Sequence, residues 1–158
     1  MSLLGHWLGC QVAVHIADRH PDRVAWLVLA SPCRDPEARW PWQQAVRLVL
    51  DAPRETPSFL PIAAAADYLR AGPARMWRAL REAMTTDASD RLRRVAAPTL
   101  VVRGERDPVV SAPWARQVTD LLARGRLLTL PGAPHGLPFS AARQLVETAR
   151  PFLLLHGS

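Results

Sequence analysis

Two residues that can do acid–base chemistry stand in matching places of this 158-residue chain. Asp107 follows the strand-like run 99–103, and His135 follows a second such run, 126–130. Sites in α/β proteins form in loops at the carboxyl ends of parallel strands, so both side chains are expected at one edge of a sheet. Together they would act as an acid–base pair with His135 as the base. The alternative interpretations are an ordinary loop histidine and a turn or N-cap aspartate.

The elements that must position this pair alternate between helical and strand patterns, which is typical of an α/β class with a parallel sheet. Leu8, Val12 and Ile16 recur at helical spacing and predict a helix that ends near residue 20. Residues 24–30 form a continuous apolar run between turn residues, which is the pattern of a buried parallel strand.

Two more helices are predicted in the C-terminal part of the chain. The first lies between the last two strands, stops at Gly125 and buries Trp114, Val118, Leu121 and Leu122. The second begins near Ser140, is kinked or ended by Pro151, and buries Leu145, Val146 and Ala149.

A third chemical feature is the glycine-bounded turn Gly5-His6-Trp7-Leu8-Gly9, which follows a short apolar stub. With Asp107 and His135 following in that order, the turn resembles the nucleophile elbow of the α/β-hydrolase family, G-x-S-x-G, with Trp7 in place of the serine. The resemblance implies a mostly parallel sheet flanked by helices, and a triad in which Asp107 orients His135. It also implies that the backbone N–H of Leu8 forms part of the oxyanion hole.

Trp7 removes the nucleophile, because an indole ring has no attacking group. Loss of a triad serine leaves at most roughly 10³ to 10⁴ of acceleration over water, and that depends on an intact oxyanion hole. A bulky residue is poorly tolerated in a strained turn, so we expect the turn to relax or the indole to fill the vacated pocket. Cys10 lies about one helical turn past the tip and is a poor substitute, and Ser31 is only slightly better.

The resemblance further implies a domain organisation. Residues 1–33 and 96–158 are expected to form a hydrolase core that lacks its N-terminal strands, and residues 34–95 a helical cap over the site. The stub strand would leave one sheet edge unpaired, which predicts self-association or marginal stability. The aromatic residues of the cap would line a pocket for an apolar substrate or pack the cap on the core: Trp40, Trp42, Phe59, Tyr68 and Trp77.

The composition of the chain limits the kinds of partner that it is expected to bind. The chain is 49% hydrophobic and has no apolar run as long as a membrane span, so we expect no membrane partner. Its net charge is +6, but the 20 basic residues, all arginine, are scattered among acids, which argues against nucleic acid. Cys10 and Cys33 lack metal-ligand spacing, so no metal or cofactor is expected. No secretory signal is visible, and a cytoplasmic location is predicted.

Three hypotheses from different classes follow. The first is a truncated α/β-hydrolase whose ancestors cleaved esters or related bonds in small apolar substrates, now weak or inactive because of Trp7. The second is an enzyme in which Asp107 and His135 act as a general base without a serine. The third is a non-catalytic binding or interaction module that keeps the pocket for a small molecule. Serine-reactive phosphonates, ligand-induced melting shifts and turnover of activated esters would separate them.

Overall fold

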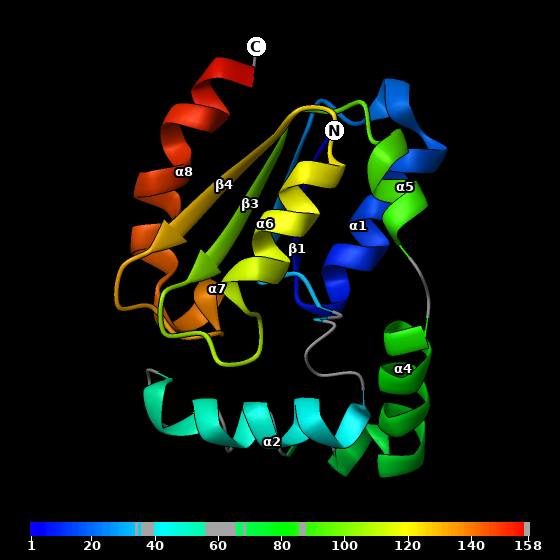
Figure 1. Cartoon of the computed structure of the whole chain (residues 1–158), viewed down its shortest axis with the longest axis vertical. Coiled ribbons are helices and arrows are strands. Elements are labelled where there is room, and N and C mark those ends of the chain that lie inside the picture. The colour runs from blue at the N-terminus through cyan, green and yellow to red at the C-terminus, as the bar shows by residue number, and fades with distance from the viewer. Residues whose placement is uncertain (34, 36–39, 56–65, 68, 86–87, 157–158) are drawn as a thin grey trace.

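The computed structural model describes residues 1–33, 35, 40–55, 66–67, 69–85 and 88–156 (Figure 1). None of the described helices is both long and apolar enough to cross a membrane. The elements, with 3-10 turns labelled η, are β1 (Ser2–His6), α1 (Leu8–Arg19), η1 (Pro21–Arg23), β2 (Trp26–Ala30), α2 (Pro41–Asp51), η2 (Ala52–Arg54), α4 (Pro73–Thr85), α5 (Ser89–Arg94), β3 (Thr99–Gly104), α6 (Ala112–Leu121), β4 (Gly125–Leu130), α7 (Leu137–Ser140) and α8 (Ala142–His156).

The four strands form one parallel sheet in the order β1-β2-β3-β4. The register places Leu29 of β2 opposite Val101 of β3 and Gly5 of β1 opposite Leu29. Strands β2 and β3 are buried along almost their whole length, because helices cover both faces of the sheet. The predicted α/β class, with a parallel sheet and flanking helices, is confirmed.

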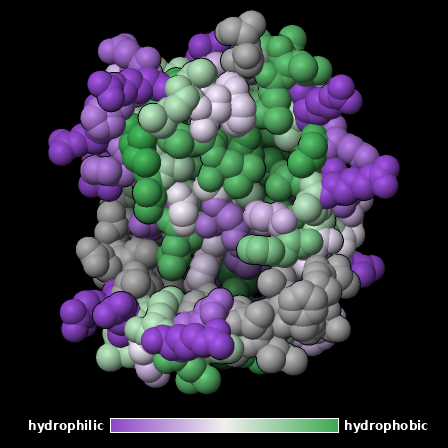
Figure 2. Space-filling model, turned by 180° about the vertical axis from the view of Figure 1, so that it is seen from behind, coloured by the Kyte–Doolittle hydropathy of each residue, from purple (hydrophilic) through white to green (hydrophobic). Residues whose placement is uncertain are grey.

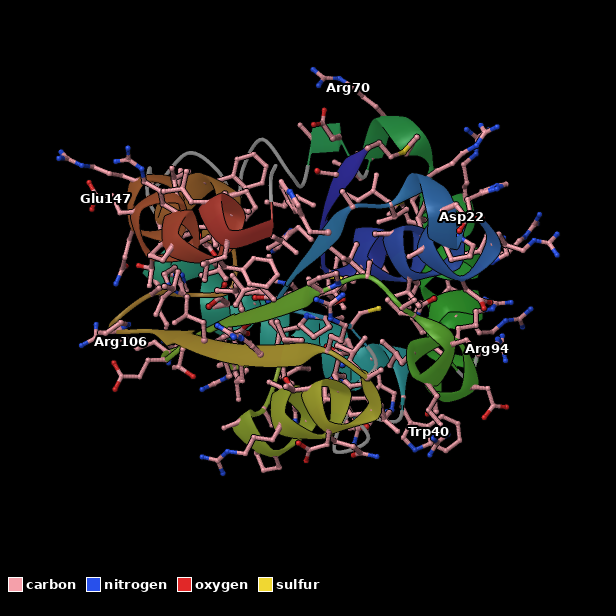
Figure 3. The ribbon with its side chains drawn as sticks, turned by 90° about the horizontal axis from the view of Figure 1, so that it is seen from above. Asp22, Trp40, Arg70, Arg94, Arg106 and Glu147 are labelled. Atoms are coloured by element: carbon pink, nitrogen blue, oxygen red, sulfur yellow. The ribbon has the colours of Figure 1, made fainter. Side chains whose placement is uncertain are left out.

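Side chains that alternate along the central strands feed two separate apolar layers. Leu29 and Val101 pack in a cluster with buried residues of α1, α5 and α6. Ala30 and Val102, one position later, pack in a second cluster with α7 and α8. Figures 1 and 3 show the same arrangement, with α1, α5 and α6 on one side of the sheet and α7 and α8 on the other.

Within residues 34–95, helices α2 and α4 lie at the carboxyl edge of the sheet, whereas α5 packs with α1 and α6 on one face of it. Helix α2 runs across the ends to which the strands β3 and β4 point, with α4 beside it (Figure 1). Gly72 has φ 90° just before α4, a conformation that favours glycine and that separates α4 from the preceding helical turn. This edge is therefore the part of the sheet that these helices cover.

Helix α1 buries a different face from the one predicted. Its buried residues are Cys10, Ala13, Val14 and Ala17, whereas Val12 is exposed. Small side chains on the inner face let the helix backbone lie close to the sheet, and the spacing of large apolar residues gave no sign of this.

Helix α8 continues through Pro151 to His156, so of the two outcomes predicted for Pro151, a kink or an end of the helix, the second is wrong. Pro151 and Glu147 are exposed, and the carbonyl that loses its donor on that side can bond to water. Leu145 and Ala149 are buried as predicted, but Val146 is exposed. The predicted role of Gly125 is also wrong, because α6 ends at Leu121 and Gly125 is the first residue of β4.

Strand β1 has an open edge. It pairs with β2 along one side, and no strand of the described chain pairs with its other side. Leu4 in the middle of this strand is largely exposed. Strand β1 lies at the back of Figure 1, and Figure 2, which looks from behind, shows hydrophobic residues gathered across the middle of that face between more polar margins.

Candidate active site

The structure brings the side chains of Asp107 and His135 into direct contact at the carboxyl edge of the sheet. Oδ2 of Asp107 lies 3.0 Å from Nδ1 of His135, and both residues are buried. The other carboxylate oxygen, Oδ1, accepts the backbone N–H groups of Val109 at 2.8 Å and Val110 at 3.0 Å. The carboxylate therefore holds His135 in one tautomer, with Nδ1–H as the donor.

The electrostatics of this pair favour an ionised aspartate. Burial alone would raise the pKa of Asp107, but the hydrogen bond and charge of His135, the N–H of Val110 and a hydrogen bond with Ser31 lower it below its usual range. An ionised Asp107 would stabilise an imidazolium on His135. The geometry is therefore that of a general base supported by a carboxylate.

Close packing between the two loops holds the pair in place. Gly104, the last residue of β3, lies so close to the His135 loop that a Cβ atom would come within 2.3 Å of the carbonyl oxygens of Ala133 and Pro134. The backbone N–H of Arg106 also donates to the Ala133 carbonyl at 3.0 Å. Glycine at position 104 is thus required for the loops to meet.

The turn at Trp7 keeps the strained shape of a nucleophile elbow. Trp7 has φ 49° and ψ −112°, a region that residues other than glycine rarely adopt. Its N–H donates to the carbonyl of Ala30 at 3.0 Å, and a Cβ on Gly5 would lie 2.7 Å from the carbonyl oxygen of Gly9. The turn has not relaxed, so the first of the two outcomes expected for Trp7 is wrong.

The indole of Trp7 lies against the histidine ring. The two ring centroids are 5.9 Å apart and the rings meet edge to face at 89°. Nε2 of His135, the atom that would take a proton from a serine, is buried and has no hydrogen-bond partner in the described chain. The indole therefore stands beside the ring that a serine hydroxyl would have to reach.

Leu8 stands where the oxyanion donor was predicted. It is the first residue of α1, and N–H groups in the first turn of a helix have no acceptor within the helix. Its N–H is thus available to a ligand in the way that the resemblance implies.

Neither side chain considered as a substitute nucleophile can reach His135 Nε2 as it stands. The Ser31 hydroxyl donates to the backbone carbonyl of His135 at 3.2 Å and hydrogen-bonds with Asp107, so it supports the pair from its other side. The Cys10 thiol donates to the carbonyls of Gly5 and Ala30, and burial raises its pKa well above the usual value. A buried neutral thiol is a weak nucleophile.

A second pair of carboxyl groups, Asp51 and Glu55, contacts the histidine loop from α2 and the segment after it. Oδ1 of Asp51 accepts the N–H of His135 at 3.3 Å, and Oε1 of Glu55 accepts the N–H of Gly136 at 2.6 Å. The hydroxyl of Ser140 also donates to Glu55. Sequence reasoning missed this pair, whose only signal was two acids four residues apart after an apolar helix.

The pKa values of the two carboxyl groups move in opposite directions because each acts on the other. Burial, followed by the hydrogen bond and charge of Glu55, raises the pKa of Asp51 to about 8. Burial opposes ionisation of Glu55 as well, but the hydrogen bonds from Asp51, Ser140 and Gly136 bring its pKa below the usual value. Near neutral pH Asp51 is therefore the protonated donor and Glu55 the anion.

His6, inside the elbow, has a structural contact with the site. Its Nε2 lies 3.1 Å from the carbonyl oxygen of His135, and the two rings are 5.1 Å apart. Burial, followed by the charge of His135, lowers the pKa of His6 to about 4. His6 is therefore neutral near pH 7 and donates to the loop that carries His135.

Of the five aromatic residues predicted to line a pocket or to pack the cap on the core, the structure describes three, and these are exposed to solvent. Trp40, Trp42 and Trp77 are at least half exposed, so they do not pack the helices on the sheet. Phe59 and Tyr68 lie outside the described residues. A small apolar cavity of about 30 Å³ lies on the α1, α5 and α6 side of the sheet, where Cys10 and Cys33 help to line it. It has room for one or two waters, not for a substrate.

Comparison with known proteins gives a family match. The sequence model of the serine aminopeptidase S33 family, a group of hydrolases, matches residues 1–142. A pimeloyl-[acyl-carrier protein] methyl ester esterase of Nitrosomonas europaea is 28% identical over 92% of this chain and 68% of its own length.

Solved structures agree in fold. An α/β-hydrolase from a lagoon-sediment metagenome superposes with a TM-score of 0.74 at 14% identity, covering 100% of this chain and 63% of its own. An E-2-(acetamidomethylene)succinate hydrolase superposes with a TM-score of 0.72 at 23% identity, covering 96% of this chain and 66% of its own. The chain thus spans slightly less than two thirds of the length of these structures.

Proposed function

Because the chain belongs to the serine aminopeptidase S33 family of α/β-hydrolases, we propose that it is an ester-hydrolase scaffold in which Trp7 silences an assembled acid–base pair. The observation that carries this proposal is the 3.0 Å contact between Asp107 and His135 beside a turn that still has elbow geometry. With tryptophan at position 7, the chain has weak or no hydrolase activity in this proposal, because the tip of the turn carries neither a hydroxyl nor a thiol.

The geometry supports a role for each group once a nucleophile is present. A serine at position 7 would stand beside His135, whose Nε2 is the unpartnered nitrogen that can remove the serine proton. Asp107 would fix the tautomer of His135 and stabilise the imidazolium. The Leu8 N–H would donate to the oxyanion of the tetrahedral intermediate.

The proposed substrates are esters or related bonds in small apolar molecules. The esterase of Nitrosomonas europaea acts, by its name, on a methyl ester. We take from it only the class of bond. In the proposal residues 34–95 form a cap over the carboxyl edge and 1–33 with 96–158 form the core, because α2 contacts the His135 loop through Asp51.

Turnover of p-nitrophenyl butyrate tests this function. We expect Trp7→Ser to hydrolyse the ester faster than both the unchanged chain and Trp7→Ala, which opens the same space without adding a hydroxyl. The gain should disappear in Trp7→Ser/His135→Ala. If Trp7→Ser is no faster than Trp7→Ala, the acid–base pair is not poised for acyl transfer and the proposal fails.

One observation favours a second candidate, the general-base enzyme without a serine. Nε2 of His135 has no partner in the described chain while Asp107 holds the opposite nitrogen, which is the arrangement of a base waiting for a proton. In that case the unchanged chain turns over an activated ester, is not labelled by a phosphonate, and loses its activity in His135→Ala. Equal rates for the unchanged chain and His135→Ala would exclude it.

We also propose that the chain self-associates through the open edge of β1. The edge offers unpaired backbone groups beside exposed Leu4. We expect a dimer or larger species in sedimentation velocity experiments, weakened by Leu4→Lys, because lysine on an edge strand opposes pairing. A monomer at micromolar concentration would contradict this.

A further inference from the structure

Helix α2 turns its polar residues toward the protein. Gln44 and Asp51, two turns apart, are both buried, and Asp51 accepts the N–H of His135. Arg47, on the same side, donates to the buried carboxylate of Asp35 at 3.0 Å and to the carbonyl of Val109 at 3.4 Å. The inner face of this helix is therefore held by hydrogen bonds and an ion pair.

The opposite face of α2 is apolar and open to solvent. Its residues follow the spacing i, i+4, i+7 and i+8, which places them on one side of a helix. Their exposed fractions are 58% for Trp42, 50% for Val46, 72% for Val49 and 56% for Leu50. We call these four residues the outer stripe of α2. A contiguous exposed apolar surface of this kind marks an interaction site, because burying it is favourable.

The margins of the outer stripe are aromatic and cationic. Trp40, directly before the helix, is exposed and lies at the margin of the molecule in Figure 3. Arg54, directly after it, is exposed and donates to the carbonyl of Leu50. The neighbouring helix α4 exposes three more arginines: Arg75, Arg78 and Arg81.

Few acids offset these cations. Among the residues between 40 and 85 whose exposure the structure describes, Asp67 is the exposed acid, and it pairs with Arg70 at 3.0 Å. Asp51 and Glu55 are buried, and the pKa of Asp51 is raised to about 8. Among the described exposed residues of α2, α4 and the segments beside them, arginines therefore outnumber acids.

We propose that the outer stripe of α2 docks on the surface of an anionic phospholipid bilayer, with the helix lying in the plane of the interface. Tryptophan and aliphatic side chains of an amphipathic helix insert at the boundary between head groups and acyl chains, and arginines beside them attract anionic lipids. This surface is independent of the chemistry at Trp7.

Charge favours lipid over a second copy of the chain. A two-fold dimer places the same patch of each copy against itself, so the arginines at the margins would face one another. Anionic head groups neutralise the same arginines. Docking of this kind needs no membrane-spanning segment, so the finding that no described helix could cross a membrane does not bear on it. It departs from the expectation of no membrane partner, which rested on the lack of an apolar run long enough to span a bilayer.

Co-sedimentation with lipid vesicles tests the proposal. The full chain is mixed with large vesicles made of equal parts phosphatidylcholine and phosphatidylglycerol, or of phosphatidylcholine alone. We expect it to sediment with the anionic vesicles, to do so less at high salt, and to lose roughly tenfold or more of its partitioning in Val46→Asp/Val49→Asp. Both substitutions are at exposed positions, so circular dichroism should show an unchanged fold.

Val146→Asp is the matched control, since Val146 is equally exposed on α8, away from α2. It should bind anionic vesicles as the unchanged chain does. Failure of the unchanged chain to bind anionic vesicles would overturn the proposal, and so would equal binding by Val46→Asp/Val49→Asp. A dimer that Val49→Asp dissociates, without any lipid binding, would show that a second copy covers the stripe instead.

Discussion

The loops that carry Asp107 and His135 and the turn that carries Trp7 lie at the same edge of the sheet, but they differ in what they retain. The loops keep both the backbone geometry and the side chains of an acid–base pair, with contacts of 2.8 to 3.0 Å around the carboxylate. The turn keeps only the backbone geometry, φ 49° and ψ −112°, and presents an indole.

This difference teaches that packing, not chemistry, holds the elbow in its strained shape. The Trp7 N–H bonds to Ala30 and the close approach of Gly5 to Gly9 leaves the chain little freedom at that point. The surrounding sheet and helix therefore fix the conformation whether or not residue 7 can react. Loss of function would then be confined to one side chain.

The largest effect is expected from the acid of the pair. In a Trp7→Ser background, Asp107→Asn should lower ester turnover by about 10⁴-fold, because the wrong histidine tautomer is then favoured. The amide oxygen can still accept the N–H groups of Val109 and Val110, so the fold should persist. Steady-state kinetics measure this, with Asp22→Asn at an exposed site as the control. Equal losses in the two variants would contradict a role in catalysis.

The next prediction concerns stability, and it tests the close packing of Gly104 against the loop that carries His135. Gly104→Ala should lower the free energy of unfolding by about 1–3 kcal/mol, because the new methyl group collides with two carbonyl oxygens. Gly9→Ala is the matched control, since no atom lies within 4 Å of the added carbon, and it should be neutral or stabilising by up to about 1 kcal/mol. Urea unfolding measures both. A neutral Gly104→Ala would mean that the loops are not tightly joined.

How much of this site could be read from the sequence depends on the range of the interaction. Asp107 and His135 were found because each lies in the loop after a strand-like run, and because they follow the elbow-like turn in the order that the resemblance implies. Asp51 and Glu55 were missed because their contact with His135 and Gly136 spans more than eighty residues, and no local pattern encodes it.

The fold shows the same limit. The continuous apolar runs of β2 and β3 predict buried strands directly, since both faces are covered. The inner faces of α1 and α8 were partly misassigned, because Val12 and Val146 fit a helical period yet point to solvent. Which of two adjacent apolar residues is buried depends on how the helix docks, and periodicity alone does not settle that.

A smaller effect tests the strain in the elbow. Trp7→Gly should be more stable than Trp7→Ala by about 1 kcal/mol, because both lose the indole but only glycine adopts this φ without strain. Thermal or urea unfolding of the two variants gives the difference. If alanine is equally stable, the turn has relaxed and the elbow geometry is not imposed by packing.

A separate effect is a pH dependence of stability that comes from the carboxyl pair. Asp51 binds its proton more tightly in the fold, with a pKa of about 8, than in the unfolded chain. Its contribution to stability is therefore complete below about pH 4 and is lost as the pH rises through about 8. Asp51→Asn should flatten the decline in unfolding free energy between about pH 4 and about pH 8. An unchanged slope would show that Asp51 ionises normally.

His6 contributes with the opposite sign, in the lower part of the same pH range. Its pKa in the fold, about 4, lies below the unfolded value, so its contribution is present above about pH 6.5 and is lost as the pH falls through about 4. The decline on the alkaline side is therefore assigned to Asp51 alone of the two.

The most direct test of the central claim is fluorophosphonate labelling of Trp7→Ser beside the unchanged chain and Trp7→Ser/His135→Ala, because the probe reacts only with an activated serine. The account predicts labelling of Trp7→Ser and of neither other protein, which would mean that one side chain separates this fold from a competent site. No labelling of Trp7→Ser, or labelling of the unchanged chain, would contradict it.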